Sequence, residues 1–263
     1  MPDDQVTFTL DGKEVTCQKG EMLLHVARRE GVYIPTLCSH GALPEYGACR
    51  VCVVEVIRRG WPRVTASCTY PVREAIEVKT HSERAERARG VNIELLLARC
   101  PGNEALQDFA RRHGVEATRF KPREEPTDCI LCGLCVRACA QACDGEAVIG
   151  FYGRGGYRDV GSPFLKDLDL CSGCGSCAAV CPTGAIRIED EGGERYVRFW
   201  NTRVKLAQCT ECGKYFAPGR LLSQVREKVP AVEDRLLALC PECRPRVYAR
   251  RMFVGVAKPE GEG

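Results

Sequence analysis

Cysteine spacing constrains this chain more than any other feature of its sequence. Nineteen of the 263 residues are cysteines. Two stretches, CILCGLCVRAC at 129–139 and CSGCGSCAAVCP at 171–182, share the spacing C-x2-C-x2-C-x3-C. Three cysteines spaced in this way curl a short loop around one corner of a cubane [4Fe–4S] cluster, and the fourth cysteine reaches a second cluster. The repeat therefore predicts two cubane clusters in one small domain.

The same spacing is found in bacterial ferredoxins, and it assigns the ligands of each cluster. We expect one [4Fe–4S] cluster on Cys129, Cys132, Cys135 and Cys181, and the other on Cys171, Cys174, Cys177 and Cys139. The fourth cysteine of each run should begin a helix, and Gly133, Gly173 and Gly175 should remove side chains where the backbone crowds a cluster. The alternative is zinc, which takes its four ligands as separate pairs and fits these runs poorly.

The composition and the N-terminal residues argue against several other classes of protein. Basic and acidic residues nearly balance, 38 against 35, which is not the footprint of a nucleic-acid-binding protein. The N-terminal sequence MPDDQVTFTLDGKEV lacks the basic and apolar regions of a signal peptide. Apolar runs such as IELLLA are too short to span a bilayer. We expect a cytoplasmic protein whose clustered cysteines bind metal rather than form disulfides.

The sequence predicts an α+β chain of four segments. Residues 1–80 form a β-rich module with a hairpin at Asp11–Gly12 and a helix that places Leu23, Leu24 and Ala27 on one face and ends near Gly31. A helical linker occupies 81–126, with helix over 83–118. The double ferredoxin domain covers 127–192, and a four-cysteine segment covers 193–263, with a helix in GRLLSQVREKV. This organisation predicts several metal centres on one chain.

The N-terminal module carries a third set of cysteines. Cys38, Cys49, Cys52 and Cys68 have the spacing C-x10-C-x2-C-x15-C. Plant-type ferredoxins hold a [2Fe–2S] cluster with a four-residue first gap. Here the longer stretch SHGALPEYGA must wrap the cluster. We expect a [2Fe–2S] centre in a β-grasp fold, with zinc as the alternative.

Residues 1–190, taken together, resemble a known family. The long first gap, the helical stretch NIELLLARCPGNEALQDFA and the two cubane motifs occur in that order. This order resembles the N-terminal part of the large iron–sulfur subunit of respiratory complex I. It is still more similar to the diaphorase iron–sulfur subunit of NAD-reducing [NiFe]-hydrogenases and the matching parts of NAD-dependent formate dehydrogenases and [FeFe]-hydrogenases. The resemblance implies an electron-transfer subunit.

The chain departs from that family in its linker. The family usually places one histidine and three cysteines there, and they bind a further [4Fe–4S] cluster. Cys100 occupies the histidine position here, and the three cysteines are missing before Leu106–Asp108. We expect this cluster to be absent and Cys100 to be structural, which puts an electron path copied from complex I in doubt. Cys143 is expected to be a packed residue or a substitute ligand, and Cys17 has no assigned role.

Two further cysteine pairs lie near the C-terminus. Cys209 and Cys212 form one C-x2-C pair, and Cys240 and Cys243 form the other. Paired knuckles of this kind are typical of zinc ribbons. Zinc is our first interpretation, a third [4Fe–4S] cluster the second, and free thiols the third. A closed zinc site would be structural and would fold a segment that has little core of its own.

The chain lacks the motifs of a flavin, nicotinamide or nucleotide site. No G-x-G-x-x-G follows a predicted strand, and no phosphate-binding loop G-x-x-x-x-G-K-[ST] occurs. Iron–sulfur clusters carry single electrons, whereas hydride chemistry needs its own cofactor site. We therefore expect no catalytic residue on this chain, which would serve as a non-catalytic subunit of an oxidoreductase complex.

The resemblance implies partners at both ends of the electron path. These are a flavin- and NAD(P)-binding iron–sulfur subunit and a catalytic module, with hydrogenase as the first choice and NAD-dependent formate dehydrogenase as the alternative. An electron-bifurcating variant would also use a ferredoxin. A different class is a free polyferredoxin that forms no obligate complex. A zinc-dependent structural or nucleic-acid-binding protein would contain no iron.

Overall fold

The computed structural model describes residues 5–125, 127–143, 145, 147–162, 168 and 170–254, without the side chains of 250–254. The chain divides into two compact units. Unit 1 comprises Met1–Gly161 and Ser176–Ala185, and unit 2 comprises Ser162–Gly175 and Ile186–Gly263. The four segments expected from the sequence stay a prediction. None of the helices in the described ranges is both long and apolar enough to cross a membrane.

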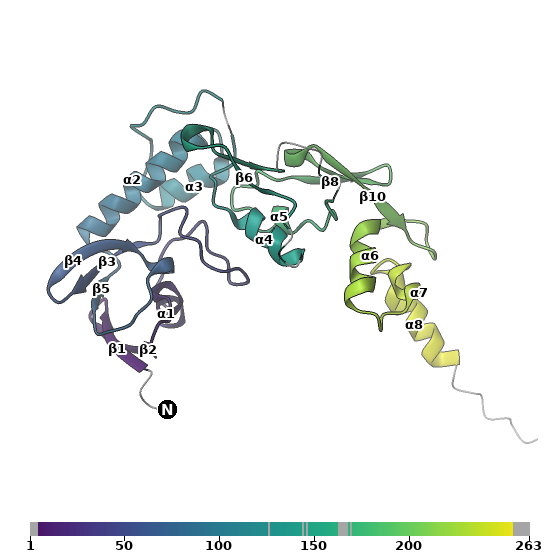
Figure 1. Ribbon diagram of the computed structural model, residues 1–263, viewed down its shortest axis with the longest axis horizontal. Helices are drawn as coiled ribbons and strands as arrows, with labels where there is room; N and C mark the ends of the chain where they lie inside the picture. Colours follow the sequence, from purple (N-terminus) through teal and green to yellow (C-terminus); the bar gives the residue numbers. More distant parts are fainter. Residues whose placement is uncertain are drawn as a thin grey trace, which may run out of the picture. The chain divides into compact units, whose positions relative to one another are not determined.

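Unit 1 begins with a mixed five-stranded sheet, coloured purple to blue in Figure 1. Its elements are β1 Gln5–Leu10, β2 Lys13–Gln18, α1 Leu23–Arg29, β3 Val53–Arg58, β4 Trp61–Ala66 and β5 Glu77–Lys79. The strand order is β2-β1-β5-β3-β4, with β1 and β5 parallel and the other neighbours antiparallel. Asp11 and Gly12 have φ of 49° and 84°, as a type I′ turn requires, so the predicted hairpin is confirmed.

Helix α1 lies against this sheet and buries one face on it. Leu23, Leu24 and Ala27 are fully buried in a core that also contains Phe8 and Val78 from the strands. The predicted helical spacing is therefore confirmed. Gly31 follows the end of α1 with φ of 73°, the left-handed conformation that commonly ends a helix.

Two helices follow the sheet and pack against each other (Figure 1). They are α2 Glu83–Arg99 and α3 Glu104–Arg112, and each starts at a capping side chain. Ser82 accepts a hydrogen bond from the amide of Ala85, and Asn103 accepts one from the amide of Leu106. The expected helix to residue 118 is too long, because Gly114 takes a left-handed φ of 72° just after α3.

In the first ferredoxin motif, the helix begins at a different residue from the one that the sequence predicted. The remaining elements of unit 1 are α4 Leu134–Ala142, β6 Gly150–Tyr152, β7 Asp159–Gly161 and α5 Ser176–Ala179. Cys139 lies inside α4 and Cys181 lies after α5, so the expectation that each fourth cysteine begins a helix is wrong. Helix α4 instead begins within the cysteine run, directly after Gly133, whose φ is 71°.

The structure shows two requirements for glycine at the three motif positions, and the expected crowding against a cluster stays a prediction. All three have positive φ, which side chains rarely adopt. A Cβ at Gly133 would lie 3.0 Å from the ring of Phe151 and 3.3 Å from that of Tyr46. At Gly173 and Gly175 a Cβ would likewise meet other side chains at 3.1–3.3 Å. Backbone conformation and side-chain packing therefore account for these glycines in the structure.

Unit 2 contains a four-stranded antiparallel sheet followed by helices, coloured green to yellow in Figure 1. Its elements are β8 Ile188–Glu191, β9 Glu194–Val197, β10 Thr202–Gln208, β11 Tyr215–Pro218, α6 Gly219–Lys228, α7 Asp234–Leu237 and α8 Cys243–Val254. The order is β11-β10-β9-β8, and α6 packs against β10 and β11. The helix expected in GRLLSQVREKV is confirmed as α6. The β8–β9 hairpin turns at residues 192 and 193, where the sequence placed a segment boundary.

The core beneath α1 makes a stability prediction. Replacing the fully buried Leu24 by alanine leaves a cavity, so we expect Leu24→Ala to lower the free energy of unfolding by about 2–5 kcal/mol. Leu95, on α2, is 48% exposed, and Leu95→Ala should change that free energy by less than about 0.5 kcal/mol. Urea denaturation followed by circular dichroism measures both. Equal losses in the two variants would contradict this description of the core.

Candidate metal centres

The N-terminal cysteines gather in one buried group within unit 1. Cys38 and Cys49 flank the long loop, Cys52 directly precedes β3, and Cys68 lies in a short 3-10 turn after β4. All four are at most 4% exposed. The amide of Cys49 donates a hydrogen bond to Sγ of Cys38 at 3.4 Å. The structure thus brings together all four cysteines that the sequence singled out.

Hydrogen bonds between neighbouring cysteines shift the pKa values of these four thiols. The thiols of Cys49 and Cys68 donate to the sulfur of Cys38 and lower its pKa to about 2. Cys68 also donates to Cys52, whose pKa falls to about 6. The pKa values of the donors, Cys49 and Cys68, are raised for the same reason. Because thiolates are the metal-binding form of cysteine, this donor set fits a bound metal centre.

The first cubane set also lies within unit 1. Cys132 and Cys135 are buried, whereas Cys129 and Cys181 are half-buried. Burial raises the pKa of Cys132 to about 12 and also raises those of Cys129 and Cys135. Buried thiols become thiolates only beside a compensating positive charge, which coordinated iron supplies. Burial alone keeps these thiols protonated, so the C-x2-C-x2-C-x3-C spacing, and not their pKa values, is what points to a cluster here.

The linker helices position this cubane loop. Arg99, in the last turn of α2, donates from Nε to the carbonyl oxygen of Cys129 at 2.7 Å. Asn103, which caps α3, donates from Nδ2 to a carboxylate oxygen of Asp128 and to the carbonyl oxygen of Thr183, both at 2.9 Å. Sequence reasoning missed these contacts. The position of Asn103 directly before a helical run predicts a helix cap, whereas no local pattern predicts the contact of Arg99.

The second cubane set is divided between the two units. Cys171 and Cys174 belong to unit 2, and Cys139 and Cys177 belong to unit 1, so this ligand set stays a prediction. Within unit 2, two arginines order the loop around Gly173. Arg195 donates to the carbonyl oxygen of Gly173 at 2.9 Å, and Arg220 donates to that of Cys171 at 3.4 Å.

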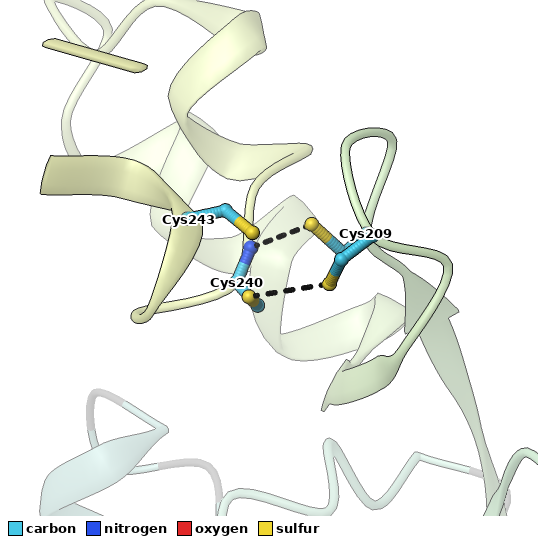
Figure 2. A group of neighbouring side chains, drawn as sticks. Cys209, Cys240 and Cys243 are labelled. Atoms are coloured by element: carbon cyan, nitrogen blue, oxygen red, sulfur yellow. Dashed lines mark hydrogen bonds between the residues drawn. The ribbon is translucent and has the colours of Figure 1, made fainter. Parts of the chain in front are cut away.

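The C-terminal pairs converge on one point in unit 2. The four sulfurs of Cys209, Cys212, Cys240 and Cys243 all lie within 4.8 Å of one another. Figure 2 shows the sulfurs of Cys209, Cys240 and Cys243 pointing toward a common centre. Across the described ranges, no other group of three or more histidine, cysteine, aspartate or glutamate side chains comes this close together.

Backbone amides and turns build this C-terminal centre. The first knuckle follows β10 and turns at Gly213, with φ of 72°. The second begins α8 at Cys243. The amide of Cys240 donates to Sγ of Cys209 at 3.3 Å (Figure 2) and lowers the pKa of that thiol to about 6. Burial raises the pKa of Cys243 to about 12. These four sulfurs form a donor set for a metal ion.

Comparison with known proteins identifies the chain. Residues 3–83 match the family of 2Fe-2S iron-sulfur cluster binding domains, and residues 164–187 match the 4Fe-4S binding domain. In a crystal structure of NAD+-reducing [NiFe]-hydrogenase, one chain is 34% identical with a TM-score of 0.59. The match covers 68% of the present chain and 85% of that one. The chain belongs to the iron–sulfur subunit family of NAD(P)-linked oxidoreductases. The fold class and the family resemblance expected from the sequence are confirmed.

The curated relatives of this iron–sulfur subunit are longer proteins, of which the chain matches only a part. The mitochondrial NADH-ubiquinone oxidoreductase 78 kDa subunit of Neurospora crassa is 34% identical over 69% of the chain. NADP-reducing hydrogenase subunit HndD of Solidesulfovibrio fructosivorans is 33% identical over 69% of it. These matches cover 27% of the first relative and 36% of the second.

The departure at Cys100 is visible in the structure of this iron–sulfur subunit. Cys100 ends α2, is fully buried, and packs in a core with Leu97 and Leu106. Burial raises the pKa of its thiol to about 12. These are features of a packed residue, and its structural role stays a prediction. Cys17, on β2, is likewise buried in the core under α1, and Cys143 caps the end of α4.

The two kinds of buried cysteine make opposite predictions for bound iron. Cys100→Ala removes only packing atoms, so the iron content of the anaerobically purified chain should stay unchanged. Cys132→Ser removes a predicted cluster ligand and should lower iron by about four atoms per chain. Iron analysis on matched preparations measures both. Loss of iron from Cys100→Ala would contradict the structural role.

Proposed function

We propose that this chain is the electron-transfer iron–sulfur subunit of a multi-subunit NAD(P)-linked oxidoreductase. It would pass single electrons between a flavin- and NAD(P)-binding subunit and a terminal catalytic subunit. The observation that carries the proposal is the buried four-sulfur group of Cys38, Cys49, Cys52 and Cys68. This group lies inside the stretch that matches 2Fe-2S domains and is followed by the cubane motifs. The chain spans about a quarter of several curated relatives, so their full activities are not transferred to it.

We assign one [2Fe–2S] and two [4Fe–4S] clusters to the sets expected from the sequence. Cys38, Cys49, Cys52 and Cys68 would hold the first, and the ferredoxin cysteines the other two. Bound clusters supply one-electron redox chemistry. The chain's own residues would supply the thiolates, bury those of the N-terminal set away from water, and orient the first cubane loop through Arg99 and Asn103. We propose no flavin or nicotinamide site on this chain.

We assign zinc to the C-terminal centre. Four thiolates at about 2.3 Å from one tetrahedral ion lie about 3.8 Å from one another. Sγ of Cys212 lies 3.8 Å from Sγ of Cys240, and all four sulfurs lie within 4.8 Å. In a cubane cluster, four irons lie between the cysteine ligands, so the ligand sulfurs must lie farther apart than around a single ion. The close spacing therefore favours a single structural ion over a third [4Fe–4S] cluster.

Hydrogenase is the complex that we propose first. The support is the likeness to a chain of NAD+-reducing [NiFe]-hydrogenase and to a subunit of an NADP-reducing hydrogenase. The partners would be a flavin-containing NAD(P)-binding subunit and a hydrogenase catalytic module. An electron-bifurcating form would add ferredoxin. A chain with this many metal-binding thiols suits the reducing cytoplasm.

Metal content tests the proposed function directly. Anaerobically purified chain should contain about ten irons, from one [2Fe–2S] and two [4Fe–4S] clusters, and about one zinc. Electron paramagnetic resonance of the dithionite-reduced protein should resolve one [2Fe–2S] signal besides the cubane signals. Iron near zero after careful anaerobic work would refute the electron-transfer function.

A ligand substitution tests the C-terminal zinc. We expect Cys240→Ser to lose the zinc while keeping about ten irons, because only this centre uses that cysteine. The segment that contains α6, α7 and α8 should then become sensitive to protease, since metal binding folds small segments of this kind. Cys100→Ala is the matched control and should keep the zinc. A loss of about four irons from Cys240→Ser would instead assign a cubane.

A further inference from the structure

The guanidinium group of Arg137 lies between two cysteine loops of unit 1. It donates to the carbonyl oxygen of Cys38 at 2.8 Å and, through the same nitrogen, to that of Cys132 at 3.5 Å. Its other nitrogens donate to the carbonyl oxygens of Pro44 and Gly133. Cys38 belongs to the [2Fe–2S] set and Cys132 to the first cubane set. One side chain therefore contacts the backbone of both ligand loops.

Aromatic rings extend this contact. The guanidinium carbon of Arg137 lies 5.5 Å from the centre of the Tyr46 ring, and that ring stacks on Phe151 with centroids 6.0 Å apart. Arg158 lies over Phe151 and donates to the hydroxyl of Tyr46 at 3.2 Å. Gly133 leaves room for both rings. Pro44 and Tyr46 lie in the ten-residue gap of the N-terminal set, so this long gap is anchored on the cubane loop.

An arginine in this position could simply be a solvated helix residue. Four carbonyl acceptors, two of them in the distant N-terminal loop, argue against that reading, because a solvated helix residue needs no such contacts. Arg137 is half-buried, and two of its acceptors lie more than ninety residues earlier in the chain. The planar fork of five donors in arginine suits several carbonyl oxygens at once, whereas the single ammonium of lysine does not.

We propose that Arg137 is a positioning residue that joins the [2Fe–2S] loop to the first [4Fe–4S] loop and raises the reduction potentials of both clusters. The inference rests on the proposed function. A fixed positive charge favours the more negative, reduced form of a cluster, and nearby hydrogen bonds and charges tune cluster potentials. Because Arg137 touches both loops, its removal affects both centres together.

Redox titration of the full chain under anaerobic conditions, followed by electron paramagnetic resonance, tests this role. We expect Arg137→Gln to shift the [2Fe–2S] midpoint and one cubane midpoint to more negative potentials. Arg137→Lys retains the charge but not the fork, so its potentials should fall between those of wild type and Arg137→Gln. Iron analysis of each variant confirms that the clusters are present.

Arg99 provides the matched control. It also donates to a cysteine carbonyl of the first cubane loop, that of Cys129, but its described contacts do not reach the [2Fe–2S] loop. Arg99→Gln should therefore move one cubane potential and leave the [2Fe–2S] potential at its wild-type value.

Two results would overturn the inference. One is an unchanged [2Fe–2S] potential in Arg137→Gln at full iron content. The other is an equal [2Fe–2S] shift in Arg99→Gln. If Arg137→Gln loses iron, Arg137→Lys decides alone, and a wild-type [2Fe–2S] potential in that variant would reject the positioning role. A wild-type chain without clusters would instead refute the proposed function, so the two failures are distinguishable.

Discussion

Burial of sulfur is the constraint on which the rest of this structure depends. A thiolate removed from water is costly unless hydrogen bonds or positive charge compensate it. In the N-terminal set the compensation comes from two neighbouring thiols and an amide, and in the C-terminal set from the amide of Cys240. The loops, turns and left-handed residues around these cysteines bring donors to sulfur. The same arrangement prepares each site for a cation.

Local patterns in the sequence predicted much of the fold. The Asp11–Gly12 hairpin, the buried face of α1 and the convergence of the two C-terminal pairs each depend on residues close in sequence or on a fixed ligand spacing. The start of α4 was missed, although its signal is local. Helix α4 begins at Leu134, inside the cysteine run, because Gly133 turns the chain there.

The contacts of Arg137 could not have been predicted from the sequence. Arg137 sits in a helix and reads locally as one more polar helix residue, yet its partners come from a loop near the start of the chain. The contact of Tyr46 could not be predicted either, because its partner Phe151 lies in a short strand far along the chain. The contacts between these two loops also concern the electron path, which the missing linker cysteines had put in doubt. Cys38 and Cys132 share one core with Val51 and Leu134, so their loops are neighbours within unit 1.

The parallel pairing of β1 with β5 has a consequence for how the N-terminal centre is made. Thr9 pairs with Glu77, and all four cysteines of the set lie between these residues in the chain. Pairings between residues far apart in the chain form slowly, because closing the long loop costs conformational entropy before the contact contributes any stabilisation. A growing polypeptide therefore presents Cys38 and Cys49 as open thiols before the strand that locks the sheet has been synthesised. During that interval these thiols are accessible to solvent, and closure of the sheet ends this access.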